Sequence, residues 1–448
     1  LRDVLSQPAL LIGIMSCIGL IALKRPFHKI MTGTLKPILG YLMLAAGAGV
    51  IVSNLDPLGK MIEHGFHITG VVPNNEAIVA VAQKVLGVET MSILVVGLLM
   101  NLCIARFTKF KYVFLTGHHS LFMACLMSAV LGTAGLSGME LILVGGFLMG
   151  AWSAISPAIG QSYTSKVTDG DEIAIGHFGS LGYYLSAWVA KYVGKAEDST
   201  EDIEIPEKWG FLRDSTLSTA LTMIVFYLIA AFAAGSEFVA TLSGDMSPYL
   251  YAVMSAMNFA VGVTIVYSGV RMILGDLIPA FQGIATKIIP NAIPAVDCAV
   301  FFTYAPTAVV LGFLSSFIGG IIGMLILGAV GGVLIIPGLV PHFFCGATAG
   351  IYGNATGGRR GAAVGAFLNG LAITFLPALA LPVLGQLGFQ NTTFGDADFA
   401  VMGLVLGNAY EWVGMAGIYG IVAIAALVLI IPNFIKTKGK VINYVEEE

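Results

Sequence analysis

Long apolar runs are the feature that most limits what this chain can fold into. Several reach the ~20 residues that an α-helix needs to cross a bilayer core of about 30 Å. A transmembrane barrel would instead show short segments of alternating polarity. The composition agrees, because 57% of the 448 residues are hydrophobic and 11% are charged, against roughly 25% charged residues in soluble domains. The sequence therefore predicts an all-α polytopic membrane protein.

The apolar runs predict about eleven transmembrane helices. Two further stretches, 158–194 and 331–360, are apolar but interrupted by Gly, Pro and polar residues, which is typical of re-entrant hairpins buried in protein. The first run lacks the basic leader of a cleavable signal peptide and is counted as a span. The predicted spans are 8–23, 35–55, 88–105, 112–134, 138–157, 217–235, 248–270, 296–329 with an interruption at Pro306, 362–387 and 414–434.

Basic residues predict the orientation in the membrane, because short cytoplasmic loops carry an excess of Lys and Arg. Lys24 and Arg25 follow the first predicted span, and Arg106 and Lys109 follow the third. This pattern favours an external N-terminus and a cytoplasmic C-terminus, so the number of spans is odd. The acidic stretch 195–214 then lies in the cytoplasm, either as a solvated linker or as a docking element for a partner.

Two pairs of short segments suggest an internal repeat. Residues 138–148 resemble 323–334, and residues 36–42 resemble 271–277. Because five spans precede the linker, the second half begins on the opposite side of the membrane, and the halves are expected to be inverted repeats with a site at their interface. The predicted organisation is a first repeat over 1–194, a linker over 195–214, a second repeat over 215–410, and a last span with a cytoplasmic tail over 411–448.

Three histidines are candidate substrate-binding residues. His118 and His119 head one apolar run, and His177 follows a Thr-Asp-Gly turn inside the first predicted hairpin. A neutral imidazole offers one donor and one acceptor, which suits a polyhydroxylated ligand. The alternative is a structural histidine that bonds to a backbone carbonyl.

An acid and two further polar segments complete the candidate site. Asp297 precedes a long apolar run, and an ionisable group at membrane depth is rarely kept without a function. Thr348 lies in the Gly-rich second hairpin, where a ligand can approach the backbone closely. Asn75 is a candidate N-cap and Glu76 lies in the first turn of the same predicted helix. Structural hydrogen bonds and helix capping are the alternatives for these residues.

No sequence motif predicts catalysis, a cofactor or a metal. The chain contains no Walker loop, zinc signature or nucleophile elbow. Its five cysteines are scattered through apolar sequence without CxxC spacing, which argues against disulfides and zinc. They are expected to be small core residues: Cys17, Cys103, Cys125, Cys298 and Cys345.

Six motifs carry a resemblance to a known family: LTGHH (115–119), VTDG (167–170), IGH (175–177), VDCAVFFTYAP (296–306), AVVLGF (308–313) and IIPGLVPHFF (335–344). Together these motifs are similar to the membrane IIC component of the bacterial phosphotransferase system for L-ascorbate (vitamin C). They extend over nearly the whole chain. The resemblance implies a homodimeric permease of eleven spans, whose core moves like an elevator against a V-shaped dimerisation domain. It also implies that separate cytosolic IIA and IIB proteins phosphorylate the substrate.

The resemblance carries some binding residues over and departs at others. It implies substrate-binding roles for His118, His177, Asp297 and Thr348. This chain has Phe122 and Phe178 where the resembled family has glutamines, and Asn75 with Glu76 where that family has a Thr-Tyr pair. We expect Asn75 and the backbone after it to contact the substrate, and Glu76 to assist through a hydrogen bond rather than as a bare charge.

The resulting hypothesis is a permease in the bacterial inner membrane that imports L-ascorbate, with IIA and IIB as partners. The alternatives are a permease for another sugar acid or polyol, an ion-coupled secondary transporter without a phosphorylating partner, and a structural membrane protein. Nothing in the sequence predicts nucleic-acid binding. The intramembrane His and Asp residues argue against the structural alternative.

Overall fold

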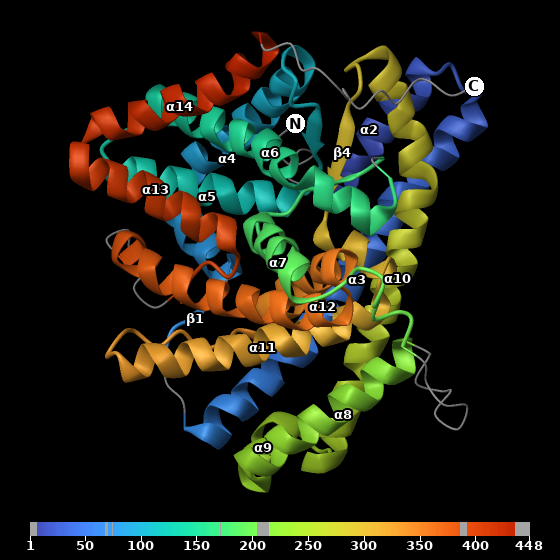
Figure 1. Cartoon of the computed structure of the whole chain (residues 1–448), viewed down its shortest axis with the longest axis vertical. Helices are drawn as coiled ribbons and strands as arrows, with labels where there is room; N and C mark the ends of the chain where they lie inside the picture. The colour runs from blue at the N-terminus through green and yellow to red at the C-terminus, as the bar shows by residue number, and fades with distance from the viewer. Residues whose placement is uncertain are drawn as a thin grey trace.

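The computed structural model describes residues 7–67, 70–73, 75–170, 172–203, 215–385 and 392–434. Most of these residues are helical (Figure 1). The helices are α2 (Pro8–Ala22), α3 (Phe27–Phe66), α4 (Asn75–Phe107), α5 (Gly117–Thr133), α6 (Gly138–Thr168), α7 (Ser180–Val193), α8 (Ser215–Ala234), α9 (Ser236–Ser243), α10 (Pro248–Lys287), the 3-10 helix η2 (Cys298–Thr303), α11 (Pro306–Ala329), α12 (Leu339–Gly385), α13 (Ala397–Val413) and α14 (Met415–Phe434). The short strands are β1 (Val72–Pro73), β2 (Tyr112–Phe114), β3 (Ala174–Ile175), β4 (Ile293–Val296) and β5 (Thr392–Thr393).

The described ranges contain seven helices that are long and apolar enough to cross a membrane. The number is eight if the bent pair Thr219–Ala234 and Ser236–Ser243, which meet at 117°, forms one span. The prediction of a multi-pass helical membrane protein is therefore confirmed. The predicted total of about eleven transmembrane helices stays a prediction.

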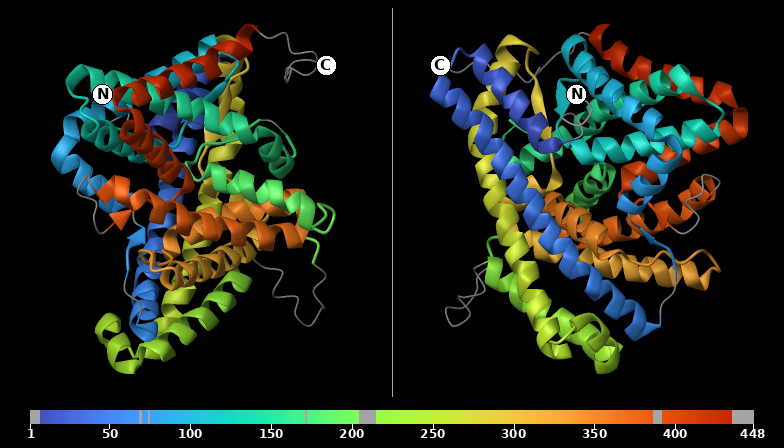
Figure 2. Two further views of the ribbon diagram at one scale, coloured as in Figure 1. Left: turned by 60° about the vertical axis from the view of Figure 1, so that its left-hand side comes forward. Right: turned by 180° about the vertical axis from the view of Figure 1, so that it is seen from behind.

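The two long helices α3 and α10 lie against each other along one flank of the molecule (Figure 2). Each contains 40 residues. A Cβ atom on Gly40 would lie 2.8 Å from the carbonyl oxygen of Gly269, and one on Gly47 would lie 2.8 Å from that of Gly262. The paired numbers change in opposite directions, so the helices are antiparallel. Glycines at these crossings let the two backbones touch, as is common between membrane helices.

Each of these long helices leads into a short segment of paired, extended backbone. After α10, β4 lies between β2 and β3 and is parallel to both. After α3, β1 pairs in parallel with β5, while the preceding Val71 forms a parallel bridge with Ile335. Extended backbone inside a membrane protein is tolerated only where its N–H and C=O groups are satisfied internally. The strands provide that pairing and fix where the chain segments after them lie.

The structure departs from the sequence expectations at several boundaries. The expected span 112–134 begins as strand β2, because its Tyr-Val-Phe segment favours extended structure, and helix α5 starts only at Gly117. Helix α6 accommodates Pro157 and continues to Thr168, so the first predicted hairpin does not begin at 158. Helix α13 was not expected as an element, and the predicted boundary at 410 falls inside it.

The second stretch that was predicted to be a re-entrant hairpin, 331–360, contains a break in a helix, and the hairpin itself stays a prediction. Helix α12 contains a break at Gly357 and Gly358, where Gly358 has φ 60°. A positive φ at this position favours glycine. The break lies close to residue 360, where the hairpin was expected to end.

The start of the predicted linker is packed against the helices rather than solvated throughout. Thr200 is buried, and its backbone N–H donates to Asn354 Oδ1 at 2.8 Å. The carboxylate of Glu201 accepts from the backbone N–H groups of Thr307 and Ala308 in the first turn of α11. Such a carboxylate satisfies N–H groups that have no partner within the helix. Residues 204–214 of the linker lie outside the described residues.

Candidate functional site

Polar residues follow the three paired strands β2, β4 and β3 at the same edge. Asp297 directly follows β4, Thr116 and His118 follow β2, and His177 follows β3. The strands are parallel and in register, with Phe114 and Ala174 both opposite Ala295. Parallel strands end at a common edge, so residues from three distant segments meet there. Three of the predicted site residues are thereby brought together.

His118 links Asp297 to the long helix α3. Its Nε2 lies 3.3 Å from Asp297 Oδ2, and its Nδ1 lies 3.1 Å from the hydroxyl of Tyr41. A neutral ring with the proton on Nε2 satisfies both contacts, because Nε2–H donates to the carboxylate and Nδ1 accepts from the tyrosine. The other carboxylate oxygen of Asp297 accepts from the N–H of Ala299 at 3.0 Å and caps η2.

His119 and His177 are buried side by side, with ring centroids 3.7 Å apart. The backbone N–H of Phe178 donates to Nδ1 of His119 at 3.2 Å. The backbone N–H of Gly179 donates to Nδ1 of His177 at 3.2 Å, and the hydroxyl of Tyr183 lies 2.7 Å from the same atom. A nitrogen that accepts from a backbone N–H carries no proton, so each neutral ring has its proton on Nε2. Both histidines are therefore set up as hydrogen-bond donors.

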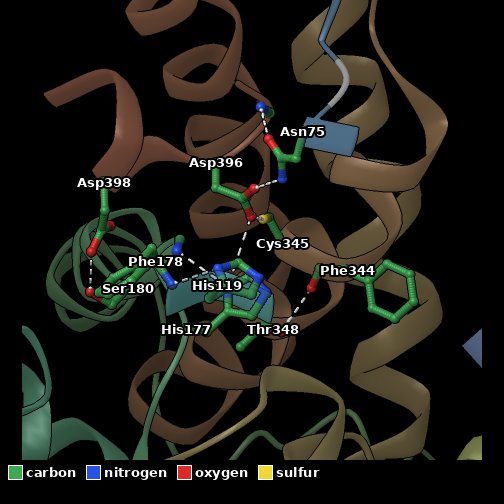
Figure 3. Close-up of polar contacts among 12 residues, drawn as sticks. Asn75, His119, His177, Phe178, Ser180, Phe344, Cys345, Thr348, Asp396 and Asp398 are labelled. Atoms are coloured by element: carbon green, nitrogen blue, oxygen red, sulfur yellow. Dashed lines mark hydrogen bonds and ion pairs between the residues drawn. The ribbon is translucent and has the colours of Figure 1, made fainter. Parts of the chain in front are cut away.

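A second polar group follows the other pair of strands. Asn75 comes after β1 and Asp396 comes after β5. The Asn75 amide donates from Nδ2 to Asp396 Oδ2 at 2.6 Å and accepts from the N–H of Gly395 at 2.9 Å (Figure 3). The thiol of Cys345 donates to Asp396 Oδ1 at 2.8 Å. We call the contacts among Asn75, Gly395 and Asp396 the Asn75 clasp.

The two polar groups meet at His177 and Asp396. Nδ1 of His177 lies 3.8 Å from Asp396 Oδ1. His119 belongs to the same cluster, in which one polar atom from each of the three side chains lies within 4.8 Å of the other two. Figure 3 shows both imidazoles below the carboxylate of Asp396. The candidate site is thus assembled from both strand systems.

The hydrogen bonds at this cluster argue against a metal ion. A histidine binds a metal through an unprotonated ring nitrogen and usually donates an N–H from the other nitrogen to a second group. Here the Nδ1 atoms of His119 and His177 both accept N–H groups, which leaves the protons on Nε2. The arrangement fits the binding of ligand oxygen atoms better than metal ligation.

The two remaining predicted site residues are Thr348 and Glu76. The hydroxyl of Thr348 is buried and donates to the backbone carbonyl of Phe344 at 2.7 Å. It keeps its acceptor lone pairs and lies next to the histidines in Figure 3. Glu76 lies in the first turn of α4, and its side chain lies outside the described residues.

The two phenylalanines that depart from the resembled family pack beside the histidines. Phe178 is fully buried and stacks on Phe114 with ring centroids 4.6 Å apart. The ring of Phe122 lies 5.8 Å from that of His118 and 5.7 Å from that of His119. This side of the site is therefore an aromatic wall rather than a set of amide groups.

Sequence reasoning missed several residues of the site. Asp396 and Asp398 lie in Phe-Gly-Asp-Ala-Asp-Phe (394–399), a segment that was assigned to no span. The criterion that selected Asp297, an acid within apolar sequence, applies equally to both. Tyr41 and Cys345 gave no signal, because a single tyrosine or cysteine in an apolar helix is usually a packing residue.

Two comparisons with known proteins describe what the chain is similar to. Residues 3–398 match the family model "PTS system sugar-specific permease component". The chain is also 28% identical over 416 residues to the "Ascorbate-specific PTS system EIIC component" of Mycoplasma pneumoniae. That alignment covers 79% of this chain and 62% of the relative, so the chain spans less than two thirds of the relative's length.

Proposed function

Because the chain belongs to the family of PTS system sugar-specific permease components, we propose that it imports a small polyhydroxylated substrate and delivers it to a cytosolic IIB protein for phosphorylation. IIB in turn receives its phosphoryl group from IIA. L-Ascorbate is the first candidate substrate, because the relative from Mycoplasma pneumoniae carries that specificity in its name. The protein acts as a transport subunit in the bacterial inner membrane, and phosphoryl transfer is the work of the partner.

The observation that carries this proposal is the set of donors and acceptors at the ends of the strands. His119 and His177 present N–H donors, and Asp297 and Asp396 present carboxylate acceptors. A sugar-like molecule carries hydroxyl groups that both donate and accept, so it can satisfy the two kinds of group together. The side-chain diol of ascorbate suits the carboxylates, and its enolate oxygen suits the histidine N–H groups.

The seam between the long helices and the rest of the chain supports an elevator movement. A small cavity lies there, with Tyr41, Thr116 and Asp297 among its lining residues. The Thr116 hydroxyl is buried and, in the described part of the chain, has no hydrogen-bond partner. A polar atom without a partner beside a cavity is a suitable contact for a substrate that crosses this seam. The transport cycle we propose moves the substrate site along α3 and α10.

The two strand systems support the predicted inverted repeats. Helices α3 and α10 have equal length, and a paired, extended segment follows each of them. Repeats of this kind place the substrate site at their interface near the membrane midplane. We further propose that the protein is a homodimer with an external N-terminus and a cytoplasmic C-terminus, as the resemblance and the charge distribution imply.

Uptake of radiolabelled L-ascorbate into cells tests the proposal. Cells that express the chain together with IIA and IIB are expected to accumulate ascorbate phosphate, and cells without IIB are expected to accumulate no labelled substrate. His177→Ala serves as the binding-deficient control. Concentrative uptake of unmodified ascorbate that collapses with the sodium or proton gradient would instead establish an ion-coupled transporter.

A neutral sugar or polyol is the second candidate substrate. The site carries two carboxylates, and among the residues that the structure describes Asp396 contacts Asn75, Cys345 and His177, none of which carries a fixed positive charge. Carboxylates without a neighbouring fixed positive charge disfavour an anionic ligand. Competition against labelled ascorbate separates the two candidates. If unlabelled D-mannitol displaces the label better than unlabelled ascorbate does, the substrate is a neutral sugar or polyol.

A further inference from the structure

Asp396 is a buried carboxylate that receives little support from the protein. It is 4% exposed. Its oxygens accept one amide N–H from Asn75 and one thiol from Cys345, and an S–H group is a weak donor. A buried carboxylate without a paired cation is costly. An ionised carboxylate accepts about four hydrogen bonds, so Asp396 keeps capacity for further donors.

Asp398, two residues later, shows what a structural acid looks like in the same region. Its carboxylate accepts from the Ser180 hydroxyl at 2.8 Å, from the Leu181 N–H at 2.9 Å and from the Trp152 indole at 3.2 Å. These three firm donors belong to the protein and hold α7 and α6 against the start of α13. The difference between the two acids indicates that Asp396 has another use.

The surroundings of Asp396 match the chemistry of a hydroxyl group. The carboxylate accepts hydrogen bonds, and the rings of His119 and His177 next to it have protons on Nε2. One hydroxyl can donate to a carboxylate and accept from an imidazole N–H at the same time. The His177 atom nearest to Asp396 is the acceptor Nδ1, so the carboxylate adds an acceptor to a cluster whose two rings each carry one N–H donor. A ligand that carries hydroxyl groups can use both kinds of group.

We propose that Asp396 is a specificity-determining residue of the substrate site and accepts a hydrogen bond from a substrate hydroxyl. Asn75 is its positioning residue, because the Asn75 clasp fixes Asp396 Oδ2 and leaves Oδ1 directed toward Cys345 and His177. The weak thiol contact is the one that the substrate hydroxyl supplements or replaces. This inference rests on the proposed function, since it assigns a residue to the same substrate site.

The first test measures binding of L-ascorbate and of D-mannitol to the purified full chain in lipid nanodiscs. Asp396→Asn is expected to weaken binding of the probe that the wild type prefers by about tenfold or more, because a charge-assisted hydrogen bond is lost. Asp276→Asn is the matched control. Asp276 lies on α10, where it pairs with Lys36 at 3.5 Å, and its substitution removes the same charge without changing the site.

The second test separates binding from folding by exchanging the two clasp residues. The double variant Asn75→Asp with Asp396→Asn retains one amide and one carboxylate, so the clasp can re-form with the charge moved to position 75. We expect its thermal unfolding temperature to return toward the wild-type value, because Asn75→Asp alone brings two carboxylates together. Its affinity is expected to stay at the level of Asp396→Asn, because position 396 still lacks the carboxylate.

Wild-type affinity in the exchanged variant, or in Asp396→Asn itself, would overturn the assignment and leave Asp396 with a structural role only. The two probes keep this result distinct from a failure of the proposed substrate. If the wild type binds D-mannitol and not ascorbate, ascorbate is the wrong substrate, and the Asp396 variants are judged by their D-mannitol affinities.

Discussion

Tyr41 and His118 connect the long helix α3 to the head of α5 across the seam of the molecule. The tyrosine hydroxyl lies 3.1 Å from Nδ1 of His118, and Nε2 of the same ring lies 3.3 Å from Asp297. The tyrosine is buried. One imidazole thus joins a residue of the long-helix flank to the acid that follows β4. If the two parts of the chain move past each other during transport, this contact has to break.

Tyr41→Phe removes the hydroxyl that the Nδ1 lone pair of His118 accepts. Loss of one such hydrogen bond costs about 0.5–1.5 kcal/mol, and we expect the affinity for substrate to fall by roughly two- to tenfold. Equilibrium binding in nanodiscs measures this change. Tyr419→Phe is the control. Tyr419 lies on an exposed part of α14, and its hydroxyl donates to the carboxylate of Glu140 on α6. Equal losses in both variants would show that the effect is not local to His118.

Alanine at the strand-end residues tests the site that the two strand systems build. His118→Ala, His177→Ala and Asp297→Ala each remove about 1–3 kcal/mol of polar contact, or roughly ten- to a hundredfold in affinity. Size-exclusion chromatography is expected to show an assembled protein in each case. His28→Ala on the exposed start of α3 is the control. Normal binding in the three variants, or failure of all three to assemble, would make these residues structural.

The class of the protein was predictable from the sequence because a bilayer imposes a simple length and polarity rule. The rule identifies apolar segments, but it does not tell a short buried strand from part of a helix. Residues 112–114 belonged to a predicted helical span, and residues 293–295 were assigned to no element, yet both segments are extended. Their pairing joins segments about 180 residues apart along the chain, and local propensity contains no information about such distant partners.

The site was predictable in part for the same reason. His118, His177 and Asp297 stood out as ionisable groups in apolar sequence, and the structure brings them together. Asp396 had the same signal but lay in a segment with no assigned element. Asn75 was expected as a helix cap, whereas its side chain holds Gly395 and Asp396 across more than 300 residues of chain. No local pattern could have identified that partner.

Two glycines of α3 give a test of the contact between the long helices. Gly47 touches the backbone of α10, whereas a Cβ on Gly49 would have nothing within 4 Å. Gly47→Ala is expected to force the helices apart and to destabilise the protein by about 1–3 kcal/mol. Gly49→Ala is expected to be neutral or stabilising by up to about 1 kcal/mol, because alanine favours the helix. Thermal unfolding in nanodiscs compares them, and equal shifts would contradict the close contact.

Orientation in the membrane is open to cysteine labelling at two exposed acids. Glu197 precedes the packed part of the linker, and Asp245 lies between α9 and α10. In a background without Cys17 and Cys103, we expect a membrane-impermeant maleimide to label Asp245→Cys on intact cells. Glu197→Cys is expected to react only after permeabilisation, because Lys and Arg gather on the cytoplasmic side. The reverse pattern would contradict the orientation inferred from the charges.

Glutamine, the residue of the resembled family, is expected to lower the stability of the protein when it replaces Phe178 and to change the substrate preference when it replaces Phe122. Phe178 is fully buried against Phe114 and Phe399, so Phe178→Gln places an amide among aromatic rings and opens a gap in them. Loss of buried aromatic packing costs roughly 3–5 kcal/mol in the extreme of truncation to alanine, and an unsatisfied amide adds about 1–3 kcal/mol. We expect this variant to unfold at a markedly lower temperature.

Phe122 is 8% exposed and faces His118 and His119, where a glutamine amide has polar partners within reach. Phe122→Gln is therefore expected to remain folded and to change the affinity for ascorbate relative to D-mannitol. If Phe178→Gln is as stable as Phe122→Gln, the aromatic wall does not hold this side of the site in place.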